Sequence, residues 1–353
     1  MAILDKVFKA AVDLKASDIH VLPGEPFMVR RLGKMIRLKS QPLTDASCRK
    51  VILEILNPEQ QRVLRDEMQL DFAYDVEGLG RFRGSAMFHN NGLSCIFRVI
   101  PGKIPSFKEL GIPDVMHKIL ENHQGIILVT GATGHGKTTT LASMVDHINS
   151  TKAHHILTVE DPIEFVHPLK KGAVNQRQIG KDTLAYANAL KGALRQDPDV
   201  IVIGELRDLE TVSLAISASE TGHLVIGTLS TSSAPKTVDR IIDSYPSGEQ
   251  NQIRAMLSES LKAVFTQRLV PSADGSCMHM AAEIMLGNLS IANLIRDNKT
   301  YQIRSTMQMG RASGMKLMDE SVLEMLQQGK ITYDTAKANI DKKELLKPFA
   351  PKA

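Results

Sequence analysis

The stretch that decides the fold is residues 131–138, which read Gly-Ala-Thr-Gly-His-Gly-Lys-Thr. This is the pattern Gly-x-x-x-x-Gly-Lys-Thr of a loop that cradles phosphate groups. The preceding residues 125–130, Gly-Ile-Ile-Leu-Val-Thr, are apolar and β-branched, which is typical of a strand buried on both faces of a parallel sheet. After the loop, Leu141, Val145 and Ile148 have helical spacing. The loop is therefore expected at a helix N-terminus, where unpaired N–H groups and the helix dipole favour anions.

The residue types in this loop predict a site for a nucleoside triphosphate and Mg²⁺. Its glycines let successive backbone N–H groups point inward, Lys137 can reach the β and γ phosphates, and Thr138 can ligate Mg²⁺. The alternative is an ordinary glycine-rich turn between a strand and a helix. The predicted nucleotide-binding residues are Gly131, Ala132, Thr133, Gly134, His135, Gly136, Lys137, Thr138 and Thr139.

Length and composition limit the class of protein. With 353 residues, of which 43% are hydrophobic, the chain is long enough for two domains that each bury a core. No segment has the roughly 18 uninterrupted apolar residues of a membrane span, and the N-terminus reads as an amphipathic helix instead of an export signal. We therefore expect a cytoplasmic protein. The cysteines are far apart and indicate neither a disulfide framework nor a zinc site.

Charge and aromatic content bear on possible partners. A net charge of +4 is compatible with attraction to anionic lipid or simply with a solvated surface. Aromatic residues make up 4% of the chain and tryptophan is absent, which leaves few platforms for stacking single-stranded bases. No nucleic acid is therefore expected as a partner.

The chain divides near a stretch rich in proline and glycine. Residues 1–100 have the short strand and helix patterns of a small α+β domain. Residues 101–112 are predicted to be a linker, because Pro and Gly disfavour a regular element there. From 113 to 290, apolar strands alternate with helices, as in a parallel sheet wrapped by helices, and residues 291–353 are expected to form a C-terminal helical region. The core strands are expected at residues 126–130, 156–159, 200–203 and 224–228.

The N-terminal domain contains two further recognisable patterns. A helix is expected over residues 45–57, where Pro58 would interrupt it. Residues 71–76 and 81–88 alternate between apolar and polar side chains and are joined by a turn with two glycines. These two stretches predict a β-hairpin.

Acidic residues follow two of the expected core strands. Glu160, Asp161 and Glu164 follow the strand at 156–159, and Glu205 follows a later strand. Ligands of such sheets bind at the carboxyl ends of the strands, so these acids should face the nucleotide. We predict that Glu164 polarises the attacking water, that Glu160 or Asp161 assists the metal, and that Glu205 contacts the metal through water. The alternative is that these acids only cap the next helix.

One histidine lies beside another core strand. His223 precedes the strand at 224–228 and could sense the γ-phosphate or donate to it. A lone histidine is more often a structural residue whose hydrogen bonds are satisfied. Both interpretations remain open from the residues alone.

Taken together, these motifs resemble those of the secretion-type ATPases of type II secretion and type IV pili, and within them the pilus retraction ATPases. The resemblance extends over almost the whole chain. The stretches similar to the Walker A element, Asp box, Walker B element, His box and N-domain signature are residues 131–138, 158–164, 204–208, 221–223 and 16–20.

The resemblance implies a fold and roles for particular residues. It implies an α/β protein, with a RecA-like P-loop NTPase C-terminal domain and a smaller PAS-like α+β N-terminal domain. Glu164 would be the catalytic acid, Glu205 the Walker B glutamate that helps to bind Mg²⁺, and His223 the first residue of the His box.

Arg83 and Arg98 match two N-domain arginines that the family places on the γ-phosphate. Guanidinium groups there would neutralise charge on the transferring phosphoryl oxygens. Because they belong to a separate domain, hydrolysis would be coupled to domain closure. The alternative is that they are exposed strand arginines paired with Asp71 or Asp75.

The resemblance also implies a function and partners. We expect a Mg²⁺-dependent ATPase in the cytoplasm, peripherally associated with the inner membrane, that forms a homohexamer and drives an inner-membrane platform protein to disassemble a type IV pilus. A paralogous motor ATPase is a further possible partner. The short N-terminal portion favours retraction over extension, because extension enzymes usually carry another domain. The alternatives are an ATPase of type IV secretion or conjugation, a nucleic-acid translocase and an inactive regulatory subunit.

Two positions depart from the family pattern. Ser230 occupies a place where the family usually has a second histidine, so that role is lost, altered or supplied elsewhere. Residues 290–296 keep only the second half of a segment characteristic of the retraction branch. Helical spacing puts Ile291, Leu294 and Ile295 on one face, for which core packing is the simpler explanation.

Overall fold

The computed structural model describes residues 3–100 and 102–350. Pro101 in the predicted linker is outside the described residues, as are residues 1–2 and 351–353 at the ends of the first and last predicted regions. Within the described ranges, the structure contains no helix with the length and hydropathy that crossing a lipid bilayer requires.

The chain forms two compact units. Unit 1 extends to Ile104 and also includes the short segment Pro162–Val166. Unit 2 comprises Pro105–Asp161 and the residues from His167 onward. The division after Ile104 lies inside the stretch predicted as a linker. The inclusion of Pro162–Val166 in unit 1 is a feature that the sequence did not indicate.

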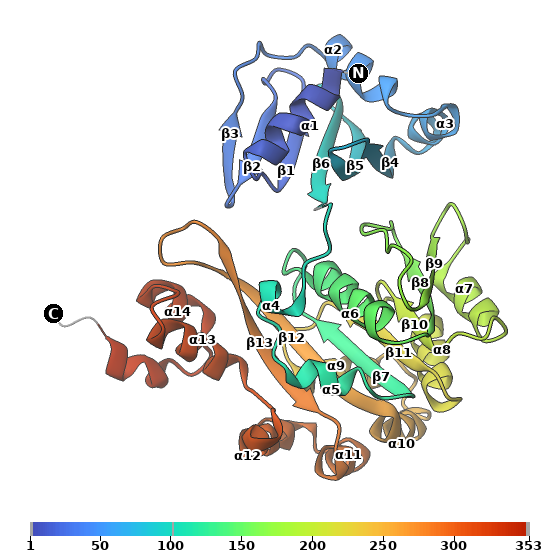
Figure 1. Ribbon diagram of the computed structural model, residues 1–353, viewed down its shortest axis with the longest axis vertical. Helices are drawn as coiled ribbons and strands as arrows, with labels where there is room; N and C mark the ends of the chain where they lie inside the picture. The colour runs from blue at the N-terminus through green and yellow to red at the C-terminus, as the bar shows by residue number, and fades with distance from the viewer. Residues whose placement is uncertain (1–2, 101, 351–353) are drawn as a thin grey trace. The chain divides into compact units, whose positions relative to one another are not determined.

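Unit 1 is built on an antiparallel sheet with helices packed against it (Figure 1). Aromatic rings hold α1 to the sheet, because Phe8 stacks on Phe82 with ring centroids 4.2 Å apart and meets Phe97 edge-on at 4.9 Å. The predicted hairpin over 71–76 and 81–88 is present as β4 and β5. The strands, in spatial order, are β3 (Lys34–Arg37), β2 (Met28–Arg31), β1 (Asp18–Val21), β6 (Gly92–Ile100), β5 (Gly80–His89) and β4 (Gln69–Val76). The helices are α1 (Ile3–Asp13), α2 (Asp45–Glu54) and α3 (Pro58–Glu67).

The structure corrects the helix predicted over residues 45–57. Helix α2 ends at Glu54, and Pro58 is the first residue of α3 instead of only a breaker. Proline suits this position because its fixed φ is helical and its missing N–H would have no partner there. Asn57 caps α3 and forms a capping box with Gln60.

Unit 2 is built on a mixed sheet in which β7 lies near the middle. From β12 to β9 neighbouring strands are parallel, and β13 is antiparallel to β12. All four predicted core strands are present, as β7, β8, β10 and β11. In spatial order, the strands are β13 (Met278–Leu286), β12 (Leu261–Pro271), β7 (Gly125–Thr130), β11 (Leu224–Leu229), β10 (Val200–Ile203), β8 (His155–Glu160) and β9 (Ala173–Gln178).

Helices cover both faces of this sheet (Figure 1). Along β7, Ile126 and Leu128 join the core under α8 and α9, whereas Ile127 and Val129 join the core under α5 and α6. This alternation explains why β7 is apolar throughout. The helices are α4 (Phe107–Leu110), α5 (Val115–Ile119), α6 (Lys137–Thr151), α7 (Tyr186–Ala193), α8 (Leu209–Glu220), α9 (Ala234–Asp243), α10 (Gln250–Ser260), α11 (Leu289–Arg296), α12 (Ile303–Met309), α13 (Met318–Gln327) and α14 (Tyr333–Asn339).

The C-terminal helices belong to unit 2 and not to a separate body. On α11, Ile291 and Ile295 are buried in the main core and Leu294 packs against it. Core packing therefore accounts for the apolar positions of this segment, as the simpler interpretation predicted.

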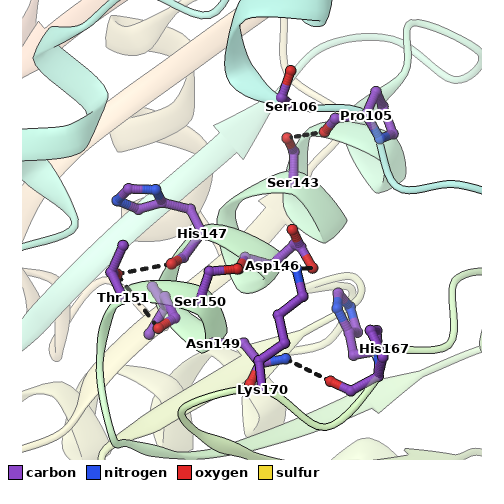
Figure 2. A network of polar contacts seen from close by, with 12 residues as sticks. Pro105, Ser106, Ser143, Asp146, His147, Asn149, Ser150, Thr151, His167 and Lys170 are labelled. Carbon is purple, nitrogen blue, oxygen red and sulfur yellow. Dashed lines mark hydrogen bonds and ion pairs between the residues drawn. The ribbon is translucent and has the colours of Figure 1, made fainter.

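Polar contacts fix the position of α6, the helix that follows the phosphate loop. The Ser143 hydroxyl donates to the carbonyl of Pro105 at 2.5 Å, which ties α6 to the segment before α4 (Figure 2). On the same helix, Asp146 pairs with the ammonium group of Lys170 at 2.6 Å. The helix N-terminus is thus carried by an element that is anchored along its length.

Candidate nucleotide-binding site

The phosphate loop joins β7 to α6, where the sequence predicted it. The backbone of Gly131, Gly134 and Gly136 has φ values of +144°, +82° and +83°, which L-residues with a side chain rarely adopt. At Gly131 a Cβ atom would also lie 2.4 Å from the carbonyl oxygen of Gln267. The loop therefore needs glycine for its curvature and for its close approach to β12. These features fit a phosphate cradle.

The start of α6 offers donors to an anion. Gly136 is the N-cap residue and supplies no side-chain cap, so the first turn of N–H groups is not satisfied by a side chain. The ammonium group of Lys137 donates to the carbonyls of Gly131 at 2.8 Å and Ala132 at 3.3 Å. Burial lowers the pKa of Lys137, and the carboxylate of Glu205 opposes that shift. A cation and free N–H groups are thus concentrated at this loop.

Two carboxylates lie at the same edge of the sheet. Glu160 ends β8, and its Oε1 accepts hydrogen bonds from the Thr158 hydroxyl at 2.7 Å and from the Gln176 amide at 3.0 Å. One residue, Gly204, separates Glu205 from the end of β10. The strands order as β7, β11, β10 and β8, so their carboxyl ends form one continuous edge with the phosphate loop. Glu160 and Glu205 therefore lie at the edge of the sheet that carries the loop, whereas Glu164 belongs to unit 1.

Glu205 has two neighbours of its own. Its Oε2 accepts from Arg207 Nε at 2.5 Å, and its Oε1 accepts from the Ser230 hydroxyl at 3.2 Å. The hydrogen bond to Glu205 raises the pKa of Arg207. The sequence interpretation placed Arg207 within the Walker B-like stretch 204–208 but gave it no role. Ser230 was noted only as a departure, and the structure gives it a partner.

The position of Glu205 is set by the residue before it. A Cβ at Gly204 would lie 3.2 Å from the Tyr186 hydroxyl and from the Val159 carbonyl, so this turn passes through a narrow space. The Thr228 hydroxyl donates to the Gly204 carbonyl at 2.5 Å. Close packing with β8 and β11 therefore directs the chain that carries Glu205.

His223 lies at the opposite edge of the sheet. It precedes β11, and its carbonyl accepts from the N–H of Gly125 at the start of β7. The full length of β7 separates it from the phosphate loop, about 16 Å at 3.3 Å per residue. Its Nδ1 lies 3.1 Å from the carbonyl of Ala218. His223 therefore does not lie beside the phosphate loop of unit 2, and its predicted contact with the γ-phosphate stays a prediction.

Unit 1 brings together three of the predicted site residues. Arg83 on β5 and Arg98 on β6 are directly opposite each other. Arg83 Nη1 lies 3.6 Å from Glu164 Oε1, and Arg98 Nε lies 3.2 Å from Asp18 Oδ1. Arg83 also lies 3.6 Å from Asp71, the partner that the alternative interpretation named. Like charges that face each other across a strand pair are destabilising. The carboxylates therefore offset the repulsion between Arg83 and Arg98.

The carboxylate of Glu164 is largely buried. Its side chain is 13% exposed. Burial raises the pKa of Glu164, and the charges of Arg83 and Arg98 oppose that shift. A carboxyl group with a raised pKa beside two guanidinium groups is typical of a functional site.

The loop, the helix N-terminus and the carboxylates at one sheet edge define a P-loop nucleoside triphosphatase. Residues 1–347 match the model of the family described as Type II/IV secretion system protein. The chain belongs to this family of secretion and pilus ATPases, as the sequence predicted. The predicted α/β fold and the prediction of an NTP hydrolase are likewise confirmed.

Individual relatives narrow the comparison. The type IV pilus retraction ATPase PilT of Pseudomonas aeruginosa is 45% identical over 322 residues, 91% of this chain and 93% of that protein. A twitching motility protein of Neisseria gonorrhoeae is 45% identical over 317 residues, 90% of this chain and 85% of that protein. A crystal structure of the pilus retraction motor PilT with bound ADP matches with a TM-score of 0.88 at 42% identity and covers 99% of both chains. The protein is thus a PilT-like ATPase.

Proposed function

We propose that this protein is the motor ATPase that retracts type IV pili and so supports twitching motility. The observation that carries the proposal is the similarity to PilT with bound ADP along 99% of both chains, together with a loop at residues 131–138 whose glycines have the positive φ values of a phosphate cradle. The ATPase DotB of Legionella pneumophila is also similar, with a TM-score of 0.83, but at 27% identity. The higher identity to PilT favours retraction over a secretion role.

The residues at the sheet edge fit the group that they would hold. The loop residues 131–139 would bind ATP through backbone N–H groups and Lys137, and Thr138 and Glu205 would hold Mg²⁺, directly or through water. Bound Mg²⁺ would supply counter-charge for the phosphate oxygens. Arg207 and Ser230 would orient Glu205.

We assign the hydrolysis roles to unit 1 residues. Glu164 would act as the base toward water, because its raised pKa brings it closer to the range in which a general base works best. Arg83 and Arg98 would neutralise charge on the transferred phosphoryl group. The ion pairs of Arg83 with Glu164 and of Arg98 with Asp18 support this proposal, because they hold the two adjacent guanidinium groups in position.

The proposal extends to partners and location. By its membership of the family, we propose a homohexamer that works at the cytoplasmic face of the inner membrane on a platform protein of the pilus, with a paralogous motor ATPase as a further possible partner. Sedimentation of the purified chain with ATP tests the oligomer. A stable monomer under these conditions would contradict a hexameric motor.

One pair of measurements tests the activity and the role together. Phosphate release by the purified protein should be lost in Lys137→Ala, because the cation of the loop is removed, and kept in Lys191→Ala, which removes a surface lysine paired with Glu210. The wild-type gene, but not Lys137→Ala, should restore twitching to a strain that lacks its retraction ATPase. Normal turnover by Lys137→Ala would refute the assigned site. An active ATPase that fails to restore twitching would refute the retraction role.

A further inference from the structure

Strand β12 continues past the end of β7 and runs beside the phosphate loop. The last paired residues are Thr130 and Thr266, whose hydroxyls are 2.8 Å apart. Beyond this pair, the carbonyl of Gln267 lies against Gly131, where a Cβ would approach it to 2.4 Å. The loop therefore rests on the segment of β12 that begins at Gln267.

Gln267 contacts the loop with its side chain as well. The side chain is buried, since the residue is 2% exposed, and its Nε2 donates to the carbonyl of His135 at 2.6 Å. The same nitrogen lies where a Cβ at Gly136 would approach it to 3.2 Å. The orientation of the amide follows from this bond, because only its nitrogen can donate to a carbonyl.

His135 receives a second bond from the same strand. The N–H of Leu269 donates to His135 Nδ1 at 3.3 Å. Nδ1 must therefore be unprotonated, with the proton of the neutral ring on Nε2. Burial lowers the pKa of His135, the charges of Arg268 and Lys137 lower it further, and a hydrogen bond with the Gln267 backbone opposes the shift, so that on balance the lowered pKa favours the neutral ring. One loop residue is thus held through both its carbonyl and its ring by two residues of β12.

We propose that Gln267 and His135 are positioning residues that hold the phosphate loop in its binding conformation. Glycine-rich loops lose much conformational freedom when they are ordered, and a ligand that must order its own site binds more weakly. The two hydrogen bonds to β12 order the loop before the nucleotide binds, so the nucleotide does not have to order it. The inference rests on the proposed nucleotide site and concerns two side chains that need not touch the nucleotide.

The surroundings of Gln267 argue against a role in packing alone. Its Oε1 is buried and has no hydrogen-bond partner among the described residues. A buried acceptor without a partner is unfavourable, so an apolar side chain of similar size would serve packing better. The presence of an amide at this position is explained if the loop requires the hydrogen bond that its Nε2 donates.

The experiment measures the Kd of ADP by calorimetry, together with kcat and KM for ATP and the thermal midpoint. The variants are Gln267→Met, which keeps the volume and removes the donor, and His135→Ala. Each should raise the Kd of ADP and the KM of ATP by about threefold to tenfold, the range for one lost hydrogen bond, with little change in thermal midpoint. The double variant should show less than the product of the two effects, because both bonds order the same loop.

Two further variants make the test specific. In His135→Asn the side-chain amide can present an acceptor close to the place of Nδ1, so it should recover most of the affinity. His155→Ala is the matched control, because its Nδ1 likewise contacts a main-chain atom, the carbonyl of Asp197 at 3.0 Å, but at the amino end of β8. Its Kd should equal that of the wild type.

Unchanged Kd in both Gln267→Met and His135→Ala would overturn the inference. So would a loss of affinity that follows a lowered thermal midpoint and is not recovered by His135→Asn. If the wild type itself bound no ADP, the proposed function would fail instead, which separates the two ideas.

Discussion

The carboxylate of Glu205 is held by two neighbours of different chemistry. Arg207 supplies a charged donor at 2.5 Å, and Ser230 supplies a neutral hydroxyl at 3.2 Å. The family resemblance leads us to expect a histidine in the place of Ser230. Unlike histidine, serine does not titrate near neutral pH, so at this position it can orient Glu205 but is a poor general acid or base.

Ser230→Ala should lower kcat for ATP by about threefold to tenfold with little change in KM, because one hydrogen bond to a carboxylate is lost. Steady-state phosphate release measures both constants. Ser232→Ala serves as the control, since that hydroxyl contacts Lys236 at 3.3 Å and not Glu205. An unchanged kcat in Ser230→Ala would show that this hydroxyl is not needed.

Removing the charge of Glu164 should lower the activity and raise the stability at neutral pH. Burial raises its pKa, so the folded protein holds the proton more tightly than the unfolded chain does. The group therefore favours folding below its usual pKa of 4.5 and loses that contribution as pH rises through the folded value. At pH 7 the buried charge is a cost, which Glu164→Gln removes.

We therefore expect Glu164→Gln to lower kcat by at least about 100-fold and to raise the thermal midpoint at pH 7 by about 2 °C. The gain in midpoint should shrink as the pH falls toward 4.5, because the raised pKa makes more of the wild-type carboxyl group neutral there. Calorimetry at the two pH values checks this. A variant that is less stable at pH 7 would mean that the pairing with Arg83 outweighs the cost of burial.

At the scale of elements, β7, the phosphate loop and α6 act as one piece. β7 is paired on both sides by parallel strands, and α6 is tied to other segments along its length. Only the loop between them has no ladder of its own. Its shape therefore depends on its glycines and on its contacts with β12.

Gly131→Ala should abolish nucleotide binding, because the new Cβ would meet a backbone atom that cannot move aside and would force an unfavourable φ. We expect a loss of stability of about 1–3 kcal/mol as well. Gly248→Ala is the control, since its Cβ would have no atom within 4 Å. Calorimetric titration with ADP measures the effect, and binding by Gly131→Ala at wild-type affinity would contradict the steric argument.

How far the sequence predicts each element depends on its pattern. The apolar runs of β7, β8, β10 and β11 are strong local signals, and all four strands were predicted. β9 reads Ala-Val-Asn-Gln-Arg-Gln and has no apolar run, so it was missed, as were β12 and β13. Without β12, the contact between Gln267 and the loop could not be anticipated, because it joins residues 132 positions apart. His223 lies at the amino end of β11, which the motif alone does not show, and its predicted role stays a prediction.

At the scale of the whole molecule, a net charge of +4 and 4% aromatic residues argue against a nucleic-acid motor. Filter binding should detect no specific retention of single-stranded DNA at physiological salt. If retention were seen, a steep fall of log K with log salt would reveal a channel that tracks phosphates. That outcome would favour a translocase over a pilus motor.

The segment Pro162–Val166 limits how this protein can be dissected. The chain passes from unit 2 into unit 1 at Pro162, just after β8, and returns to unit 2 at His167. A truncated chain beginning at Pro105 would retain this segment without the residues that surround it, and Phe165, now 4% exposed, would become an apolar surface. The ATPase core expressed alone should therefore be prone to self-association, and solubility would return if those five residues were replaced by a short polar bridge.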